Sequence, residues 1–143
     1  MPDYKKILLV VDLSDDSQLV GERAKAIAAC YRSEIMLLHV VEYVPVEPMG
    51  EALLPTVQIE SELVERARKK LTELASKLGL SEARQLIETG GIKTEIIRAA
   101  QRLGVDLIVL GSRERHGLAI LLNFTEDTIL HAAPCDVLAV RLH

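Results

Sequence analysis

Short runs of aliphatic residues constrain the fold of this 143-residue chain more than any other feature. Four of them lie at residues 7–11, 34–43, 105–111 and 135–142, apolar at consecutive positions rather than at every second one. A strand that is apolar on both faces must be covered on both sides, which is typical of parallel sheets in α/β proteins. A weaker, more polar run at residues 83–88 is the third of five expected strands, and its polarity predicts a place at a sheet edge.

Helical spacing appears between the strands. Residues 17–32 form the first expected helix, which Ser14 or Ser17 can cap. Asp15 and Asp16 suit the positive end of its dipole. The inward positions of this helix are Val20, Ala24, Ile27, Ala28 and Tyr31.

Two further helices have a clear apolar face, and a fourth is expected at residues 125–132. The long helix at residues 56–78 ends at Gly79 and presents Ile59, Leu63, Ala67, Leu71, Leu74 and Leu78 along one side. The next helix follows a Gly90-Gly91 turn, is closed by Gly104 and directs inward Ile92, Ile96, Ala100 and Leu103.

Alternating strands and helices predict an α/β fold, a single domain over residues 1–143 with one doubly wound parallel sheet and helices on both faces. Such sheets bind ligands beyond the carboxyl ends of the strands, where the winding reverses. Asp12 follows the first strand and Gly111 ends the fourth. If these strands are neighbours, one cleft holds both residues.

The composition disfavours several classes of partner. A net charge of −4 and an aromatic content of 3% without tryptophan give no basic surface or stacking platform for nucleic acid. The apolar run at residues 7–11 is too short for a signal segment or a membrane span. Cys30 and Cys135 are expected to be free, buried thiols, which suits a reducing, cytoplasmic location without membrane contact.

Five segments carry a resemblance in a fixed order. They are YKKILLVVDLSDDS, LLHVVE, TGG before a helix, GVDLIVLGSRERHGL and APCDVLAV. Together they resemble the universal stress protein family. The resemblance implies strand order 3-2-1-4-5 and a cytosolic homodimer paired through the last strand, with interface residues Val137, Leu138, Ala139, Val140 and Arg141.

The resemblance also raises the question whether this chain has the ATP-binding loop of the family. Members that bind ATP carry Gly-x-x-Gly, nine residues, then Gly-Ser or Gly-Thr. Gly111 and Thr125 match the ends of this motif and Gly117 is retained, whereas Glu114 and Phe124 replace two glycines. A carboxylate about 4 Å from a phosphate charge costs roughly 4 kcal/mol at an effective dielectric of about 20.

Two hypotheses therefore explain these residues: a nucleotide-binding site, or purely structural roles. Its site would comprise Asp12, Val40, Gly111, Arg113, Arg115, Gly117 and Thr125, with ATP and magnesium as the cofactor. The arginines favour this site, because guanidinium groups recognise phosphate. In the structural alternative, Gly111 turns the chain, the arginines are solvated, Thr125 or Asn123 caps a helix, and Asp12 caps the first helix or holds its loop.

No catalytic or metal-binding constellation is visible in the sequence. The nucleophile elbow and the Walker loop are absent. His39, His116, His131 and His143 lack ligand spacing. His39 is expected to be a satisfied core imidazole, and Cys135, entering a buried strand, to be a poor nucleophile. A response-regulator receiver would need a phosphorylatable aspartate after the third strand and a lysine after the fifth, and a synthetase-type pyrophosphatase would need glycines in DLSDDS.

We therefore expect a non-catalytic, dimeric stress-response protein without a cofactor, acting through unidentified protein partners. The alternative is a nucleotide-dependent switch. Residues 42–55, which contain prolines and cannot be regular structure, cover the cleft, contact a partner or simply connect two elements.

Overall fold

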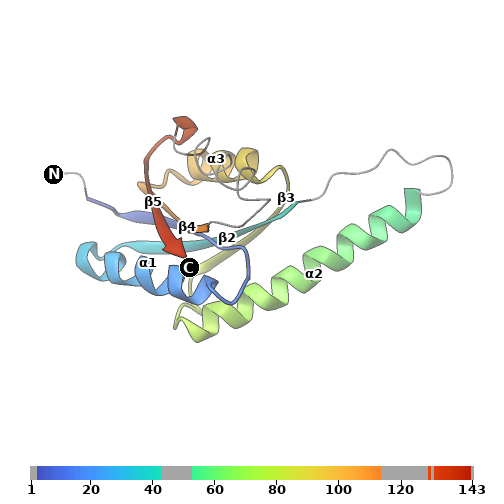
Figure 1. Ribbon diagram of the computed structural model, residues 1–143, viewed down its shortest axis with the longest axis horizontal. Helices are drawn as coiled ribbons and strands as arrows, with labels where there is room; N and C mark the ends of the chain where they lie inside the picture. Colours follow the sequence, from blue (N-terminus) through green and yellow to red (C-terminus); the bar gives the residue numbers. More distant parts are fainter. Residues whose placement is uncertain (1–2, 43–52, 114–128, 130, 143) are drawn as a thin grey trace.

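A five-stranded, all-parallel sheet forms the centre of the computed structural model, which describes residues 3–42, 53–113, 129 and 131–142 (Figure 1). The strand order is β3-β2-β1-β4-β5, which confirms the predicted fold class and order. The strand bounds are β1 Lys6–Val10, β2 Glu34–Glu42, β3 Arg84–Gly90, β4 Leu107–Arg113 and β5 Asp136–Leu142. In the described residues β3 pairs only with β2, so the polar run does lie at an edge.

Helices cover both faces of the sheet. Helices α1 (Ser17–Tyr31) and α2 (Leu53–Lys77) lie on one face, and α3 (Ile92–Leu103) lies on the other (Figure 1). Ile7 and Leu9 of β1 belong to the core beneath α1 and α2, whereas Leu8 belongs to the core beneath α3. All three are fully buried, which explains why the strand is apolar at every position. Of the expected helix at residues 125–132, only residues 129, 131 and 132 are described, and they are helical.

The predicted N-cap of α1 is wrong. Asp16, rather than Ser14 or Ser17, occupies the N-cap position and makes no side-chain capping bond. The hydroxyl groups of Ser14 and Ser17 donate to Asp12 instead. Tyr31 is 44% exposed rather than inward, and its ring packs edge-on against Tyr4 at a centroid distance of 5.1 Å.

Helix α2 is longer than the strands on which it packs. Its 25 residues span about 38 Å, against about 30 Å for the 9 residues of β2. The Leu53 end therefore extends beyond the sheet (Figure 1). Ile59 is 52% exposed, which corrects the predicted buried position. The helix also begins before residue 56, so residues 53–55 are helical and are not part of an irregular loop.

The cysteines are free, but the expectation that both are buried is wrong. Cys30 is exposed because it lies on the outer side of the last turn of α1, and Cys135 is half-buried just before β5. Among the described residues, none of the helices is long and apolar enough to cross a membrane.

Candidate functional site

A cavity of about 620 Å³ opens at the carboxyl ends of the central strands. The strand order reverses between β1 and β4, which is where doubly wound sheets bind ligands. Strand ends, the start of α1 and the middle of α2 contribute its polar lining, which comprises Asp12, Ser17, His39, Glu42, Arg66 and Lys70. Apolar lining comes from both cores and includes Val11, Val40, Leu63, Ala67, Ile92 and Ile96.

Asp12 holds the loop between β1 and α1. Its Oδ1 atom accepts hydrogen bonds from Ser14 N at 3.0 Å, Ser14 Oγ at 2.7 Å and Ser17 Oγ at 3.0 Å. Ser17 is only 2% exposed, so this bond satisfies a buried hydroxyl. Leu13, between them, adopts a left-handed conformation with φ of 63°. The loop-holding interpretation of Asp12 is therefore correct, while the same residue also lines the cavity.

His39 joins β2 to the end of β1. Its Nδ1 atom lies 2.8 Å from the carbonyl oxygen of Val11. A carbonyl can only accept, so Nδ1 donates this hydrogen bond. The side chain is half-buried and lines the cavity, which agrees with a satisfied imidazole.

Gly111 is a glycine because its neighbours occupy the space of a side chain. A Cβ atom there would lie 2.7 Å from Leu142 Cδ1 and 3.2 Å from Val20 Cγ2. Close packing of β5 and α1 thus accounts for this residue without any ligand. The cavity that the described residues line is large enough for a nucleoside-sized body.

The predicted nucleotide-site residues divide into three groups. Asp12, Val40 and Gly111 line the same cavity. Arg113 ends β4 opposite Leu142 of β5, and its side chain lies outside the described part of the structure. Arg115, Gly117 and Thr125 lie outside the described residues, as do Glu114 and Phe124.

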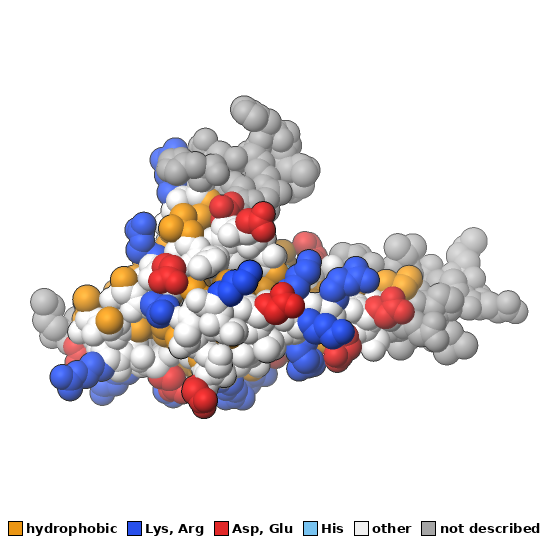
Figure 2. Space-filling view, turned by 90° about the horizontal axis from the view of Figure 1, so that it is seen from below, with side chains coloured by type: hydrophobic (Ala, Val, Ile, Leu, Met, Phe, Trp, Pro, Cys, Tyr) orange, Lys and Arg blue, Asp and Glu red, His pale blue; other side chains and the backbone are white. Residues whose placement is uncertain are grey.

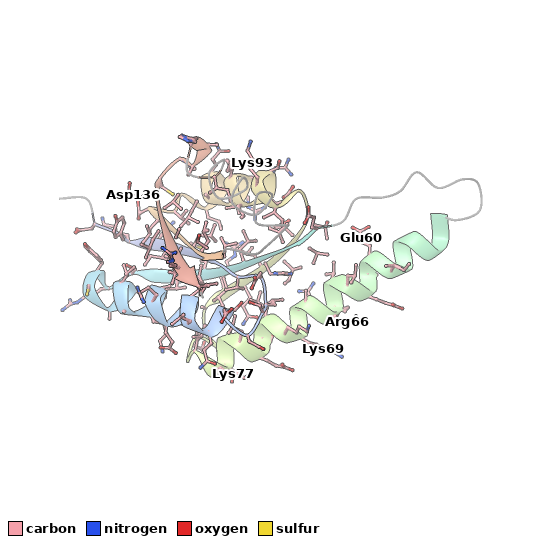
Figure 3. The ribbon with its side chains drawn as sticks, viewed as in Figure 1. Glu60, Arg66, Lys69, Lys77, Lys93 and Asp136 are labelled. Atoms are coloured by element: carbon pink, nitrogen blue, oxygen red, sulfur yellow. The ribbon has the colours of Figure 1, made fainter. Side chains whose placement is uncertain are left out.

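The sequence analysis missed the contribution of α2. Arg66 and Lys70 line the cavity from this helix, one turn apart (Figure 3 labels Arg66). A signal for them exists in the sequence, because each precedes by one position a residue of the predicted apolar stripe, Ala67 and Leu71. Cations at such flanking positions extend their charged ends from the border of a buried helix face.

Nothing in the described part of the chain forms an activated catalytic group of the kinds considered. No group of three or more His, Cys, Asp or Glu side chains there could hold a metal ion. Burial raises the pKa of the Cys135 thiol, and the carboxylates of Asp136 and Asp106 raise it further. A thiol with a raised pKa is less ionised near neutral pH and therefore a weaker nucleophile.

Comparisons with known proteins agree on one family. A sequence profile described as "Universal stress protein family" matches residues 3–141. The chain is 40% identical to Universal stress protein A homolog 2 of Coxiella burnetii, over 99% of this chain and 98% of that protein.

Solved structures share the fold. UspA from Lactobacillus plantarum has a TM-score of 0.84 at 23% identity, covering 99% of this chain and 100% of that one. A universal stress protein in complex with cAMP has a TM-score of 0.63 at 18% identity, covering 97% and 98% of the two chains.

Proposed function

This chain belongs to the universal stress protein family, and we propose that within it the protein is a non-catalytic, cytoplasmic stress-response regulator that acts as a homodimer through contacts with other proteins. The observation that carries this proposal is the open edge of β5. In the described residues this strand pairs only with β4, so backbone groups along its other side need partners.

The side chains of β5 suit pairing with a second copy. Val137 and Leu138 are half-buried, and Ala139 is exposed at mid-strand. A small exposed residue lets two strands approach closely, and a two-fold axis supplies an identical edge. Val140 is buried and Arg141 exposed, so the strand alternates between core and surface near its end.

Light scattering coupled to size exclusion tests this proposal. The wild-type protein should be a dimer at micromolar concentration, and Ala139→Lys should yield a monomer because two like charges would face each other across the axis. Ala29→Lys on the exposed side of α1 is the matched control and should remain dimeric. Leu138→Pro should also break the dimer. A monomeric wild-type protein, or an unaffected Ala139→Lys dimer, would contradict the interface.

A second candidate function, a ligand-dependent switch, is favoured by the cavity. Its volume of about 620 Å³ lies in the usual range for small-molecule sites. A related fold has been solved with cAMP, which is a property of that protein. ATP with magnesium is the cofactor that the family resemblance suggests. The described residues fit the nucleoside part of this cofactor, since the polar side chains of Asp12 and His39 line the cavity beside apolar walls.

Calorimetric titration with ATP and magnesium, after removal of any co-purified nucleotide, tests the switch. Micromolar binding supports it, and Arg113→Ala should then weaken the affinity whereas Glu114→Gly should strengthen it. Absence of binding up to ~1 mM would remove ATP as a ligand and leave protein contacts as the output.

A further inference from the structure

We propose that Arg66 and Lys70 of α2 form an anion-binding wall of the cavity, and that the ligand is a small phosphate ester whose anionic group binds against α2 rather than beside the carboxylates of Asp12 and Glu42. This inference rests on the ligand-switch proposal and names the group that the ligand must carry. Both side chains line the same cavity. Residues four apart on a helix lie about 6 Å from each other, so one anion can contact both.

Among the described residues, neither of the two cations, Arg66 and Lys70, has an ion-pair partner. By contrast, the neighbouring Arg68 pairs with Glu65 at 3.5 Å, on a part of α2 that does not line the cavity. Figure 2 shows basic and acidic side chains interspersed over the face of the molecule that α1 and α2 cover. The two positive charges that border the cavity are therefore available to a ligand.

The described strand ends attract an anion less, because Asp12 and Glu42 both line the cavity and contribute negative charge. An anionic group near these carboxylates would be repelled, whereas the same group near α2 would be attracted.

The separation of charge across the cavity defines the chemistry of the ligand. Its anionic end faces Arg66, whose guanidinium binds phosphate oxygens in pairs, and Lys70, which adds a point charge. Its hydroxyl or amino groups face polar side chains at the strand ends, where His39 and Glu42 lie. The body between them contacts apolar side chains. A phosphorylated nucleoside or sugar meets all three requirements.

The experiment compares four probes by calorimetry: AMP, adenosine, ribose 5-phosphate and inorganic phosphate. The test variant is Arg66→Gln/Lys70→Gln. The matched control, Arg68→Gln/Lys69→Gln, removes the same charge from α2 at positions that do not line the cavity. The test variant should weaken AMP binding by about 10- to 100-fold, leave adenosine binding unchanged and reduce the dependence of AMP affinity on salt. The control should bind every probe as the wild-type protein does.

The outcomes separate the two proposals. If wild-type protein binds AMP and the test variant, folded by circular dichroism, binds it equally well, the anion wall is wrong and the switch stands. Equal wild-type affinities for AMP and adenosine would also overturn the wall. If the wild-type protein binds ribose 5-phosphate but not AMP, the anion-binding wall stands and a nucleotide is excluded as the ligand. No binding of any probe up to ~1 mM would overturn both.

Discussion

Replacing Gly21 by alanine should destabilise the protein, although the same change within a helix usually stabilises it. Gly21 lies inside α1 and faces the end of α2. A Cβ atom there would lie 2.4 Å from Leu78 Cδ1, 2.9 Å from Cδ2 and 3.2 Å from Cγ. Carbon atoms in contact prefer about 3.5–4.0 Å, so Leu78 must move. Because Leu78 is fully buried, it has no path into solvent.

Two effects decide the size of the change. Alanine gains about 1 kcal/mol over glycine in a helix interior. Overpacking a buried contact costs about 1–3 kcal/mol. The net result is a loss of about 1 kcal/mol in the free energy of unfolding, or a fall of about 3–4 °C in the melting temperature of a domain this size.

A second substitution should reverse the sign of the effect of Gly21→Ala on the free energy of unfolding. Leu78→Ala alone should cost about 3 kcal/mol because it leaves a cavity between α1 and α2. In that background the new methyl group of Gly21→Ala has room, so the substitution should stabilise by about 1 kcal/mol. The resulting coupling of about 2 kcal/mol is large enough to measure in a double-mutant cycle.

Urea unfolding followed by circular dichroism gives the four free energies, provided that all variants are compared at one protein concentration. Stabilisation by Gly21→Ala in both backgrounds would refute the contact. The contact matters for the site because it fixes the end of α2, the helix from which Arg66 and Lys70 line the cavity.

Three further predictions concern the loop, the thiols and α2. Asp12→Ala should lower the free energy of unfolding by about 1–2 kcal/mol, because buried Ser17 Oγ loses its acceptor, whereas the exposed Asp15→Ala should have little effect; equal effects in thermal denaturation would contradict the loop-holding role. Cys30 should react with iodoacetamide at pH 8 before Cys135, because the raised pKa of the Cys135 thiol leaves less of it as thiolate. Equal labelling of the two cysteines by mass spectrometry would argue against this difference. Ile59→Ala should change stability by less than ~0.5 kcal/mol, whereas Leu71→Ala, at a fully buried site, should cost about 3 kcal/mol; similar losses in urea would show that Ile59 is buried in solution.

The arrangement of strands and helices could be predicted from the sequence because it depends on local patterns. Continuous aliphatic runs such as Ile7–Leu9 require burial on both faces, and the helices between them have the spacing to provide it. Gly79 and Gly104 were recognised as helix ends, and both adopt left-handed conformations, with φ of 71° and 63°. The order of the strands came from the resemblance of five segments to a family.

Polar residues were harder to assign, because their partners lie elsewhere in space or at unexpected positions nearby. Ser14 and Ser17 have the residue type of an N-cap, yet both donate to Asp12, whose role in holding the loop was only one of several alternatives in the sequence. The apolar stripe of α2 predicted burial at Ile59, but the helix is longer than the strands, so that part of the stripe lies beyond the sheet.

The sequence by itself determined that this chain forms a doubly wound α/β sheet and predicted that Asp12 and Gly111 lie at the edge where such sheets bind ligands, since hydrophobic periodicity and chain order carry that information. Only the tertiary structure decided which residues surround this edge. It places Leu142 against Gly111 and thereby assigns the glycine to packing, and it brings Arg66 and Lys70 of a distant helix to the same cavity. The physical reason is that charge and free volume at a site depend on which surfaces meet, and that depends on packing between elements far apart in the chain.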